Sequence, residues 1–477
     1  METRNLIGGE WVTADSGEQI DVYNPATDAL LGAVPKAGAG ETARAIGAAH
    51  DAWEGWRSRT GAERGGLVRQ LAEAMRRDRE RLAALMTAEQ GKPLAEAAGE
   101  INYAASFFDF AAGEAERIYG DTIPASAPDK RILAIRQPVG VCAIVTPWNF
   151  PAAMITRKLG PALAAGCTAV IKPASATPLS ALAIGELAVE AGIPAGVINI
   201  VTGSSREISS AIFADRRVRK LSFTGSTEVG RQLMRQASDN LLRLSLELGG
   251  HAPLIVFDDA DVDVAVKGAI ASKFRNAGQT CICANRFFVQ EGIYDEFVAR
   301  FEQAVAALRV GDGMAEGAQI GPLIDDDAIE KVERHVADAR EKGARLRIGG
   351  RRIRIDGLAD RFYAPTVLED VTADMLCFQE ETFGPVAPLR RFTTEDEAVE
   401  LANDSPYGLA SYFFTRDASR LMRVAERLEY GIVGANDGAP STAQAPFGGV
   451  KQSGFGREGG KYVMDEYTEI KYISWKL

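Results

Sequence analysis

Cysteine and histidine are scarce in this sequence of 477 residues, which contains three histidines and five cysteines. An odd, sparse set of cysteines does not suit the disulfide scaffold of a small secreted protein, so we expect reduced thiols. Cys281 and Cys283 form the single C-x-C pair. No histidine lies at zinc-ligand spacing from this pair, and we therefore expect no metal site.

Clustered positive charge and long apolar runs are also lacking. The formal net charge is -11, which argues against a broad surface for nucleic acids or anionic membranes. The longest nearly uncharged stretch, Leu159 to Ile171, contains a proline and several glycines and is shorter than the ~20 residues that span a membrane. The opening METRNLIGGEWV has no apolar core of signal-peptide length. We therefore expect a cytoplasmic protein without nucleic-acid or membrane partners.

The length and the pattern of apolar residues predict an α/β protein with two large domains. A single hydrophobic core stops growing near ~250–300 residues, and this chain exceeds that size. From Gly140, apolar runs such as VGVCAIV and TAVIK alternate with helical segments such as LSALAIGELAVEAG. This alternation is typical of βαβ units around a parallel sheet, and a second such pattern follows LELGG.

Two short segments alternate like exposed strands, RILAIRQPVG near residue 131 and EYTEIKYISW from Glu466. Neither is long enough to be stable alone. We expect each to add to another sheet, in the same chain or in a neighbouring subunit.

Cys281 lies in FRNAGQTCICANR, a turn of small and polar residues after a helical stretch. A lone cysteine is more often an inert core residue than a nucleophile. A reactive thiol needs backbone amides, a helix dipole or a nearby base, because its ordinary pKa leaves little thiolate at neutral pH. The turn offers access and amides, so we interpret Cys281 as a candidate nucleophile. Cys283 is interpreted as a packed bystander, with a metal or redox partner as the alternative.

Two further polar residues end apolar runs. Glu247, in LSLELGGHAP, is a candidate general base if burial raises its pKa; the alternative is a strand-end acid satisfied by backbone amides. Asn149, in TPWNFP, is a candidate donor to an oxyanion; the alternative is an ordinary turn asparagine.

Two glycine-rich segments resemble phosphate-binding loops. GFGREGG, from Gly454, matches G-x-G-x-x-G, but no strand-turn-helix unit with enough following chain surrounds it, so we reject it as a dinucleotide fingerprint. FTGSTEVG joins a strand end to a helix start, so Gly225 and Ser226 are candidates to bring amides to a pyrophosphate. Arg231 occupies the position of the P-loop lysine, which makes a kinase-like function a weak alternative.

Seven segments, in the order TPWNFP, IKPAS, FTGS, LELGG, GQTCICANR, EETFGPV and PFGGVKQSG, resemble the signature set of the aldehyde dehydrogenase superfamily. The resemblance extends from about residue 5 to the C-terminal end. It implies a Rossmann-like dinucleotide-binding domain over 1–118 and 139–247 and an α/β catalytic domain over 248–455. It also implies a small β oligomerisation element over 119–138 and 456–477, and hence a homo-oligomer, a dimer or tetramer.

The resemblance also implies roles for individual residues. Cys281 would be the nucleophile, Glu247 the base that activates the deacylating water, and Asn149 the oxyanion donor beside the Cys281 amide. The implied cofactor-binding residues are Trp148, Lys172 and Ser175 with Gly225 and Ser226 at the pyrophosphate and Glu381 and Phe383 at the nicotinamide half.

Cofactor preference follows from one position in this set. Ser175 stands where NAD-specific members have a glutamate that repels a 2′-phosphate, and Lys172 lies close by to attract one. We therefore expect NADP to be accepted and preferred, with NAD as the alternative.

Within the superfamily, MITRKLGPALAAGCT, SKFRNAGQTCICANR and KQSGFGREGGKY resemble succinate-semialdehyde dehydrogenases most. This implies that Arg157, Arg275 and Ser441 hold the distal carboxylate of a small acidic aldehyde. A buried arginine that is unpaired in the empty site is costly, so we expect a carboxylated substrate to gain both attraction and orientation from the two arginines.

Several alternatives remain open at this stage. GANDGAPSTAQAPFGG departs from the family at Asp437 and Pro440, which keeps 2-oxoglutarate semialdehyde, glutarate semialdehyde or another small acidic aldehyde as candidate substrates. A cysteine hydrolase and a non-catalytic oligomer are the rival classes. In a hydrolase, FTGS and EETFGPV would have no purpose, and a non-catalytic relative would be expected to lose Cys281 or Glu247.

Overall fold

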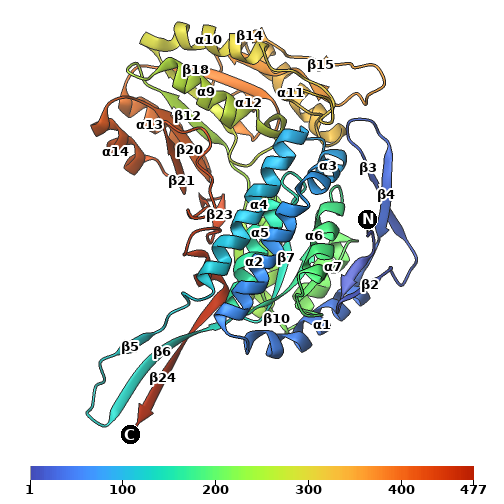
Figure 1. Ribbon diagram of the computed structural model, residues 1–477. Coiled ribbons are helices and arrows are strands. Elements are labelled where there is room, and N and C mark those ends of the chain that lie inside the picture. Colours follow the sequence, from blue (N-terminus) through green and yellow to red (C-terminus); the bar gives the residue numbers. More distant parts are fainter. Residues whose placement is uncertain (1) are drawn as a thin grey trace.

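The computed structural model describes residues 2–477 and has two α/β lobes with a projecting β-sheet (Figure 1). The first lobe contains an eight-stranded sheet in the order β2-β1-β9-β8-β7-β10-β11-β23. Its five central strands are parallel, β1 and β23 pair with them in antiparallel fashion, and β2 pairs antiparallel with β1 at the outer edge. The strands are β1 (Asn5–Ile7), β2 (Glu10–Val12), β7 (Val141–Val145), β8 (Thr168–Lys172), β9 (Ile198–Ile200), β10 (Val218–Thr224), β11 (Arg243–Glu247) and β23 (Gly454–Phe455).

Eight helices accompany this sheet, and local signals explain several of their boundaries. Three of them follow one another between Ala39 and Gln90, and Thr60 and Glu63 form a capping box at the start of the second. The helices are α1 (Ala39–Arg57), α2 (Gly61–Arg77), α3 (Arg79–Gln90), α4 (Leu94–Glu114), α5 (Ala153–Ala165), α6 (Leu179–Glu190), α7 (Ser205–Ala214) and α8 (Thr227–Ala237). A small hairpin of β3 (Gln19–Tyr23) and β4 (Leu30–Pro35) lies near the second lobe.

The second lobe contains a seven-stranded sheet with its own hydrophobic core. Its order is β14-β17-β18-β13-β12-β20-β21, and only β14 is antiparallel to its neighbour. The strands are β12 (Ala252–Val256), β13 (Ala284–Gln290), β14 (Arg345–Ile348), β17 (Thr366–Glu369), β18 (Val386–Phe392), β20 (Ala410–Phe414) and β21 (Ile432–Ala435). The helices are α9 (Val262–Lys273), α10 (Tyr294–Ala306), α11 (Asp326–Glu341), α12 (Leu376–Gln379), α13 (Glu395–Asn403) and α14 (Ala418–Arg427).

The third sheet projects from the body of the molecule (Figure 1). It consists of β5 (Asp121–Ile123), β6 (Lys130–Pro138) and β24 (Thr468–Lys476), all antiparallel. The two segments predicted as exposed strands therefore pair with each other, from Thr468 opposite Pro138 to Lys476 opposite Lys130.

Two details differ from the expected segment boundaries. β23 falls inside 248–455, yet it pairs with β11 in the first sheet. The segment 456–477 is not all strand, because α15 (Val463–Tyr467) precedes β24. The two lobes otherwise have the α/β architecture with parallel sheets that the sequence predicts.

Candidate active site

A cavity of about 650 Å³ lies between the two lobes, at the carboxyl ends of the parallel strands of the first sheet. Strands β7, β8 and β10 contribute their last residues, and the second lobe contributes the turn of Cys281, the start of α11 and the loop after α12. Ligands of open parallel sheets bind at this end of the strands. Nine of the predicted site residues line the cavity: Trp148, Asn149, Lys172, Ser175, Gly225, Ser226, Cys281, Glu381 and Phe383.

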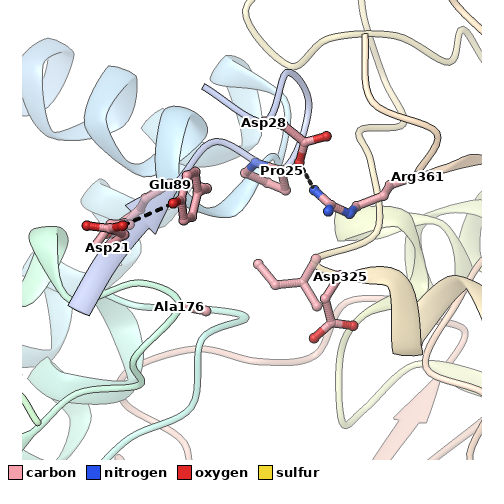
Figure 2. A pocket seen from close by; sticks show the side chains of 10 residues that line it. Asp21, Pro25, Asp28, Glu89, Ala176, Asp325 and Arg361 are labelled. Atoms are coloured by element: carbon pink, nitrogen blue, oxygen red, sulfur yellow. Dashed lines mark hydrogen bonds and ion pairs between the residues drawn. The ribbon is translucent and has the colours of Figure 1, made fainter. Parts of the chain in front are cut away.

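A second cavity, of about 400 Å³, lies beside the first and shares Ile324 and Asp325 with it. Figure 2 shows that acidic side chains surround it, with Asp28 paired to Arg361. Glu89 also lines this cavity, and its carboxylate accepts the amides of Leu179 and Ser180 at the start of α6. No cysteine lines it, so the thiol chemistry belongs to the first cavity.

Cys281 lies in the turn that leads into β13, and its side chain is half-buried at the cavity. The turn depends on three successive residues with left-handed backbone, Asn276, Ala277 and Gly278. A Cβ at Gly278 would lie 2.2 Å from the carbonyl oxygen of Gly384, so only glycine lets this turn approach the loop after α12. The sequence GQTC therefore fixes the thiol against that loop.

Burial is the main influence on the Cys281 thiol and raises its pKa to about 12. Arg157 and Arg275 act in the opposite direction, whereas Glu381 and Glu247 raise the pKa further. Cys281 is therefore held as a neutral thiol, and its proton must pass to a base before the sulfur attacks a carbonyl carbon.

Glu247 is the last residue of β11 and is 2% exposed. Neither carboxylate oxygen has a hydrogen-bond partner among residues 2–477. Burial, followed by the nearby charge of Glu458, raises its pKa well above the ordinary value. The alternative of a carboxylate satisfied by backbone amides does not agree with these contacts, and a raised pKa is what the predicted role of a general base requires.

Asn149 is buried, and its main chain and side chain are held by different partners. Its Nδ2 donates to the carbonyl oxygen of Gln279 at 3.0 Å. Its own carbonyl oxygen accepts from Lys92 Nζ at 2.7 Å and from Asn276 Nδ2 at 3.0 Å. Because an amide nitrogen carries two hydrogens, one remains for an oxyanion.

The residues expected at the pyrophosphate differ in whether their main-chain amides already have hydrogen-bond partners. Ser226 caps α8 through a hydrogen bond from the Val229 amide, and the first amides of that helix lack partners within it. The amide of Gly225 instead donates to the carbonyl oxygen of Glu247 at 3.1 Å. The Gly225 amide therefore has a main-chain partner at the cavity, and the start of α8 offers the amides that have none.

At the other positions expected to bind cofactor, charged groups have few partners. Lys172 ends β8, its Nζ donates only to the carbonyl oxygen of Pro173, and burial lowers its pKa to about 8. Ser175 is exposed at the rim of the cavity. Burial raises the pKa of Glu381 to about 7, and its Oε1 accepts from the Gly250 amide.

Trp148 and Phe383 bring two aromatic rings together at the same cavity, with centroids 5.7 Å apart in an edge-to-face arrangement. Lys331 of α11 donates to the carbonyl oxygen of Glu381 and fixes the loop that carries Phe383. Lys331 has no distinctive motif in the sequence, because its contact depends on the packing of α11 against this loop.

The three residues expected to bind a carboxylate lie in different environments. Arg157, on α5, is 2% exposed and forms an ion pair of 2.7 Å with Glu458. Arg157 is therefore not unpaired in the empty site, because Glu458 supplies the counter-charge. Arg275 has no ion-pair partner among residues 2–477, and its guanidinium lies 5.1 Å from the ring centroid of Phe150.

Ser441 is linked to this region through aromatic side chains. Its Oγ shares a hydrogen bond of 2.5 Å with the hydroxyl of Tyr103, whose ring packs edge-on against Phe107. The Phe107 ring lies 5.6 Å from the Arg157 guanidinium. Asp437 is exposed and accepts the amide of Ala439 within its own loop.

A buried charge cluster that the sequence analysis missed lies behind Glu247. Lys158 contacts both Glu458 and the hydroxyl of Thr224, and Glu458 also pairs with Arg157. Glu458 lies in GFGREGG, the segment rejected as a dinucleotide loop. A glutamate among glycines marks Glu458 as unusual in the sequence. The position of its basic partners could not be predicted, because Lys158 lies 300 residues earlier.

Comparisons with known proteins agree with this architecture and site. The aldehyde dehydrogenase family profile matches residues 11–473. The chain is 58% identical over 468 residues to succinate-semialdehyde dehydrogenase [NADP(+)] GabD of Escherichia coli, covering 98% of this chain and 96% of that protein. It is 57% identical to a glutarate-semialdehyde dehydrogenase of Pseudomonas putida, with coverage of 98% and 96%.

A solved structure described as an E. coli NADP dependent enzyme superposes with a TM-score of 0.98 at 57% identity, covering 100% of this chain and 98% of that one. The fold and the thiol site define an oxidoreductase of the aldehyde dehydrogenase type. The chain belongs to the aldehyde dehydrogenase family, which confirms the resemblance. No helix within residues 2–477 is both long and apolar enough to cross a membrane.

Proposed function

We propose that this enzyme oxidises succinate semialdehyde, or a similar small carboxylated aldehyde, to the acid with NADP or NAD. The proposal rests mainly on the positions of Cys281, Glu247 and Asn149, which lie close together near one cavity. Arg275, a cation without an ion-pair partner among the described residues, lies close to the thiol. The similarity to GabD of E. coli supports this choice of substrate.

The site residues account for a covalent mechanism. Cys281 passes its proton to a base and attacks the aldehyde carbon, which forms a thiohemiacetal whose oxyanion accepts from Asn149 Nδ2 and the Cys281 amide. When bound, the nicotinamide supplies the hydride acceptor. Glu247 then takes a proton from the water that releases the acid from the Cys281 thioester. Each of these groups acts on the same carbon.

The cavity fits a dinucleotide phosphate. Lys172 is a buried ammonium with one carbonyl partner, and α8 begins at the same cavity. Both features favour anions. With no carboxylate at exposed Ser175, nothing at that position repels a 2′-phosphate, which supports NADP as the preferred cofactor. Substituting Ser175→Glu should shift the ratio of kcat/KM values toward NAD; an unchanged ratio would show that this position is not decisive.

Glutarate semialdehyde is the second candidate substrate, because a relative of nearly equal identity carries that name. Steady-state rates with succinate, glutarate and 2-oxoglutarate semialdehydes and with butanal test the substrate. Succinate semialdehyde should exceed butanal, which has the same carbon count but no anion. Preference for butanal or a bulky aromatic aldehyde would contradict the carboxylate-binding site.

We also propose a homo-oligomer, a dimer or tetramer, in the cytoplasm. The projecting sheet supports an oligomer, because β24 exposes Ile470, Tyr472 and Trp475. All five cysteines are free thiols, which suits a reducing compartment. The segments 119–138 and 456–477 are the proposed oligomerisation element, and 1–118 with 139–247 and 248–455 remain the proposed dinucleotide-binding and catalytic domains.

A further inference from the structure

A buried ion pair lies beneath the oxyanion site, between the end of α3 and the first half of α4. Lys92 Nζ lies 2.5 Å from Glu100 Oε2, and the two side chains are only 1% and 2% exposed. Removing two charges from water is costly, so a buried pair does not by itself favour folding over a packed apolar pair. The contacts that this pair makes with its surroundings point to another use.

Both members of the pair contact the main chain of one short segment. Lys92 Nζ donates to the carbonyl oxygen of Asn149 at 2.7 Å. Glu100 Oε1 accepts the amides of Ala152 at 3.0 Å and Ala153 at 3.1 Å, at the start of α5. The pair therefore holds residues 149–153 at both ends, with the lysine at a carbonyl and the carboxylate at a helix N-terminus.

The same segment is tied to the turn that carries Cys281. Asn276 Nδ2 donates to the Asn149 carbonyl oxygen, and Gln90 Nε2 donates to Asn276 Oδ1 at 3.0 Å. Gln90 Oε1 in turn accepts the amide of Lys92 at 3.0 Å. Lys92 and its neighbour Gln90 thus hold the two main-chain segments that supply the oxyanion donors.

Lys92 also lies close to the side chains at the substrate end. Its Nζ is 3.9 Å from the ring centroid of Phe150, and the guanidinium of Arg275 is 5.1 Å from the same centroid. The ring follows Asn149 directly in the sequence. Lys92 therefore also contacts the residue that directly follows the oxyanion donor.

We propose that Lys92, held by Glu100, is a positioning residue that fixes the Asn149 amide toward the oxyanion. Lys92 itself touches neither the thiol nor the reacting carbon. This role rests on the proposed function, since it requires that an oxyanion forms at the Cys281 site. It predicts that substituting Lys92 lowers kcat only in protein that retains the Asn149 side chain.

A double-mutant cycle of Lys92→Met and Asn149→Ala tests this role. A hydrogen bond to a charged group accounts for roughly tenfold to over a hundredfold in rate, so Lys92→Met should lower kcat by that factor. The KM for the aldehyde and the Kd for NADP should change less than about threefold. In the Asn149→Ala background, Lys92→Met should cause no further loss. Equal losses in both backgrounds, or full activity of Lys92→Met, would overturn the proposal.

Two further variants keep the test informative if Lys92→Met does not fold. Lys92→Arg retains a cation and should recover part of the lost kcat, whereas Glu100→Gln should reproduce the loss and its dependence on Asn149. The proposal would be contradicted if folded Lys92→Arg recovered no kcat and folded Glu100→Gln showed no loss that depends on Asn149. Lys220→Met is the matched control, because Lys220 is equally buried but contacts Ser245 and Glu466 near the opposite end of β10. It should lower Tm without dependence on Asn149.

Hydrolysis of an activated ester at Cys281 also passes through an oxyanion and needs no dinucleotide. In the same double-mutant cycle with p-nitrophenyl acetate, Lys92→Met should lower the rate of ester hydrolysis only in protein that retains Asn149. If the parent oxidises the aldehyde but Lys92→Met lowers the rate equally with and without Asn149, only the role of Lys92 is rejected and the proposed function stands. A parent that oxidises no aldehyde but hydrolyses the ester rejects the proposed function, and the ester cycle still decides the role of Lys92.

Discussion

At the scale of single residues, burial sets the chemistry of the site. Cys281 and Glu247 both have raised pKa values, chiefly because burial disfavours their charged forms. Transfer of the Cys281 proton to an ionised Glu247 keeps one buried anion in the site, whereas ionising both groups would place two there.

The two neighbouring cysteines should differ sharply in their effect. Cys281→Ala should abolish aldehyde oxidation and leave dinucleotide binding nearly intact, because only the nucleophile is lost. Cys283 is buried, and its Sγ donates to the carbonyl oxygen of Lys273 at 3.1 Å, so Cys283→Ala should retain most of the activity. Initial rates and a fluorescence titration with NADPH measure both effects. Normal turnover by Cys281→Ala would exclude the covalent mechanism.

Lys172 should make NADP binding depend on pH. Its pKa is about 8 before cofactor binds, and a 2′-phosphate beside it would raise that value. Binding therefore takes up a proton above pH 8, and the affinity for NADP should fall by up to about tenfold per pH unit from there. Calorimetric Kd values between pH 6.5 and 9.5 measure this effect, with NAD as the control ligand. Parallel curves for NAD and NADP would show that Lys172 does not meet the phosphate.

Arg275 should contribute more to substrate selection than Arg157. Arg157 is already paired with Glu458, whereas Arg275 has no such partner among the described residues, so a substrate carboxylate gains more from Arg275. Arg275→Ala should lower kcat/KM for succinate semialdehyde roughly tenfold to over a hundredfold, by loss of a charged hydrogen bond. Butanal should be much less affected.

Arg157→Ala is the comparison variant for this prediction. It should lower Tm, because Glu458 loses a buried partner, and it should slow both aldehydes. Equal slowing of both aldehydes by Arg275→Ala would reject the carboxylate contact.

The sequence was sufficient to find residues whose own segment is distinctive. Asn149, Glu247 and Cys281 each stand in a short motif, and their order along the chain identified the site. Lys92 and Glu458 carry no comparable local signal. Lys92 reaches Asn149 across 57 residues and Glu458 reaches Lys158 across 300, so only the packing of α4, α5 and the C-terminal segment brings them to the site.

At the scale of elements, the projecting sheet stands apart because its β24 side chains are largely exposed instead of packed against the two lobes. β24 pairs with β6 along its full length, while Ile470, Tyr472 and Trp475 are each at least 60% exposed. Periodicity predicted both strands, because alternation of apolar and polar residues is local information. It did not predict that they pair with each other, since register depends on the partner.

Polar substitution on β24 should separate assembly from folding. Ile470→Ser, Tyr472→Ser and Trp475→Ser together remove exposed apolar area that few contacts within the chain use. The triple variant should keep the far-ultraviolet circular dichroism of the parent and form smaller species in sedimentation velocity experiments. An unchanged sedimentation coefficient would show that this face does not carry the proposed interface. Substituting exposed Leu30→Ser, on the hairpin of the first lobe, is the control.

At the scale of the whole molecule, the site exists only where the two lobes meet. The first lobe supplies Asn149, Glu247 and the start of α8, and the second supplies Cys281 and the loop of Glu381. The alternation of strands and helices predicted two α/β patterns and parallel sheets. The bounds implied by the family resemblance place 454–455 with the second lobe, and nothing local in these residues indicates that they form an edge strand beside β11.

The position of β23 also has a consequence for synthesis of the chain. β11 ends at Glu247, and its outer edge is covered only by Gly454 and Phe455. A ribosome adds ~5–20 residues per second, so this edge stays unpaired for roughly 10–40 s after Glu247 is made. An unpaired strand edge is a template for association with other chains. Glu247 therefore gains its neighbouring strand only after translation has passed Phe455, and until then the edge of β11 must be shielded from other chains by something other than β23.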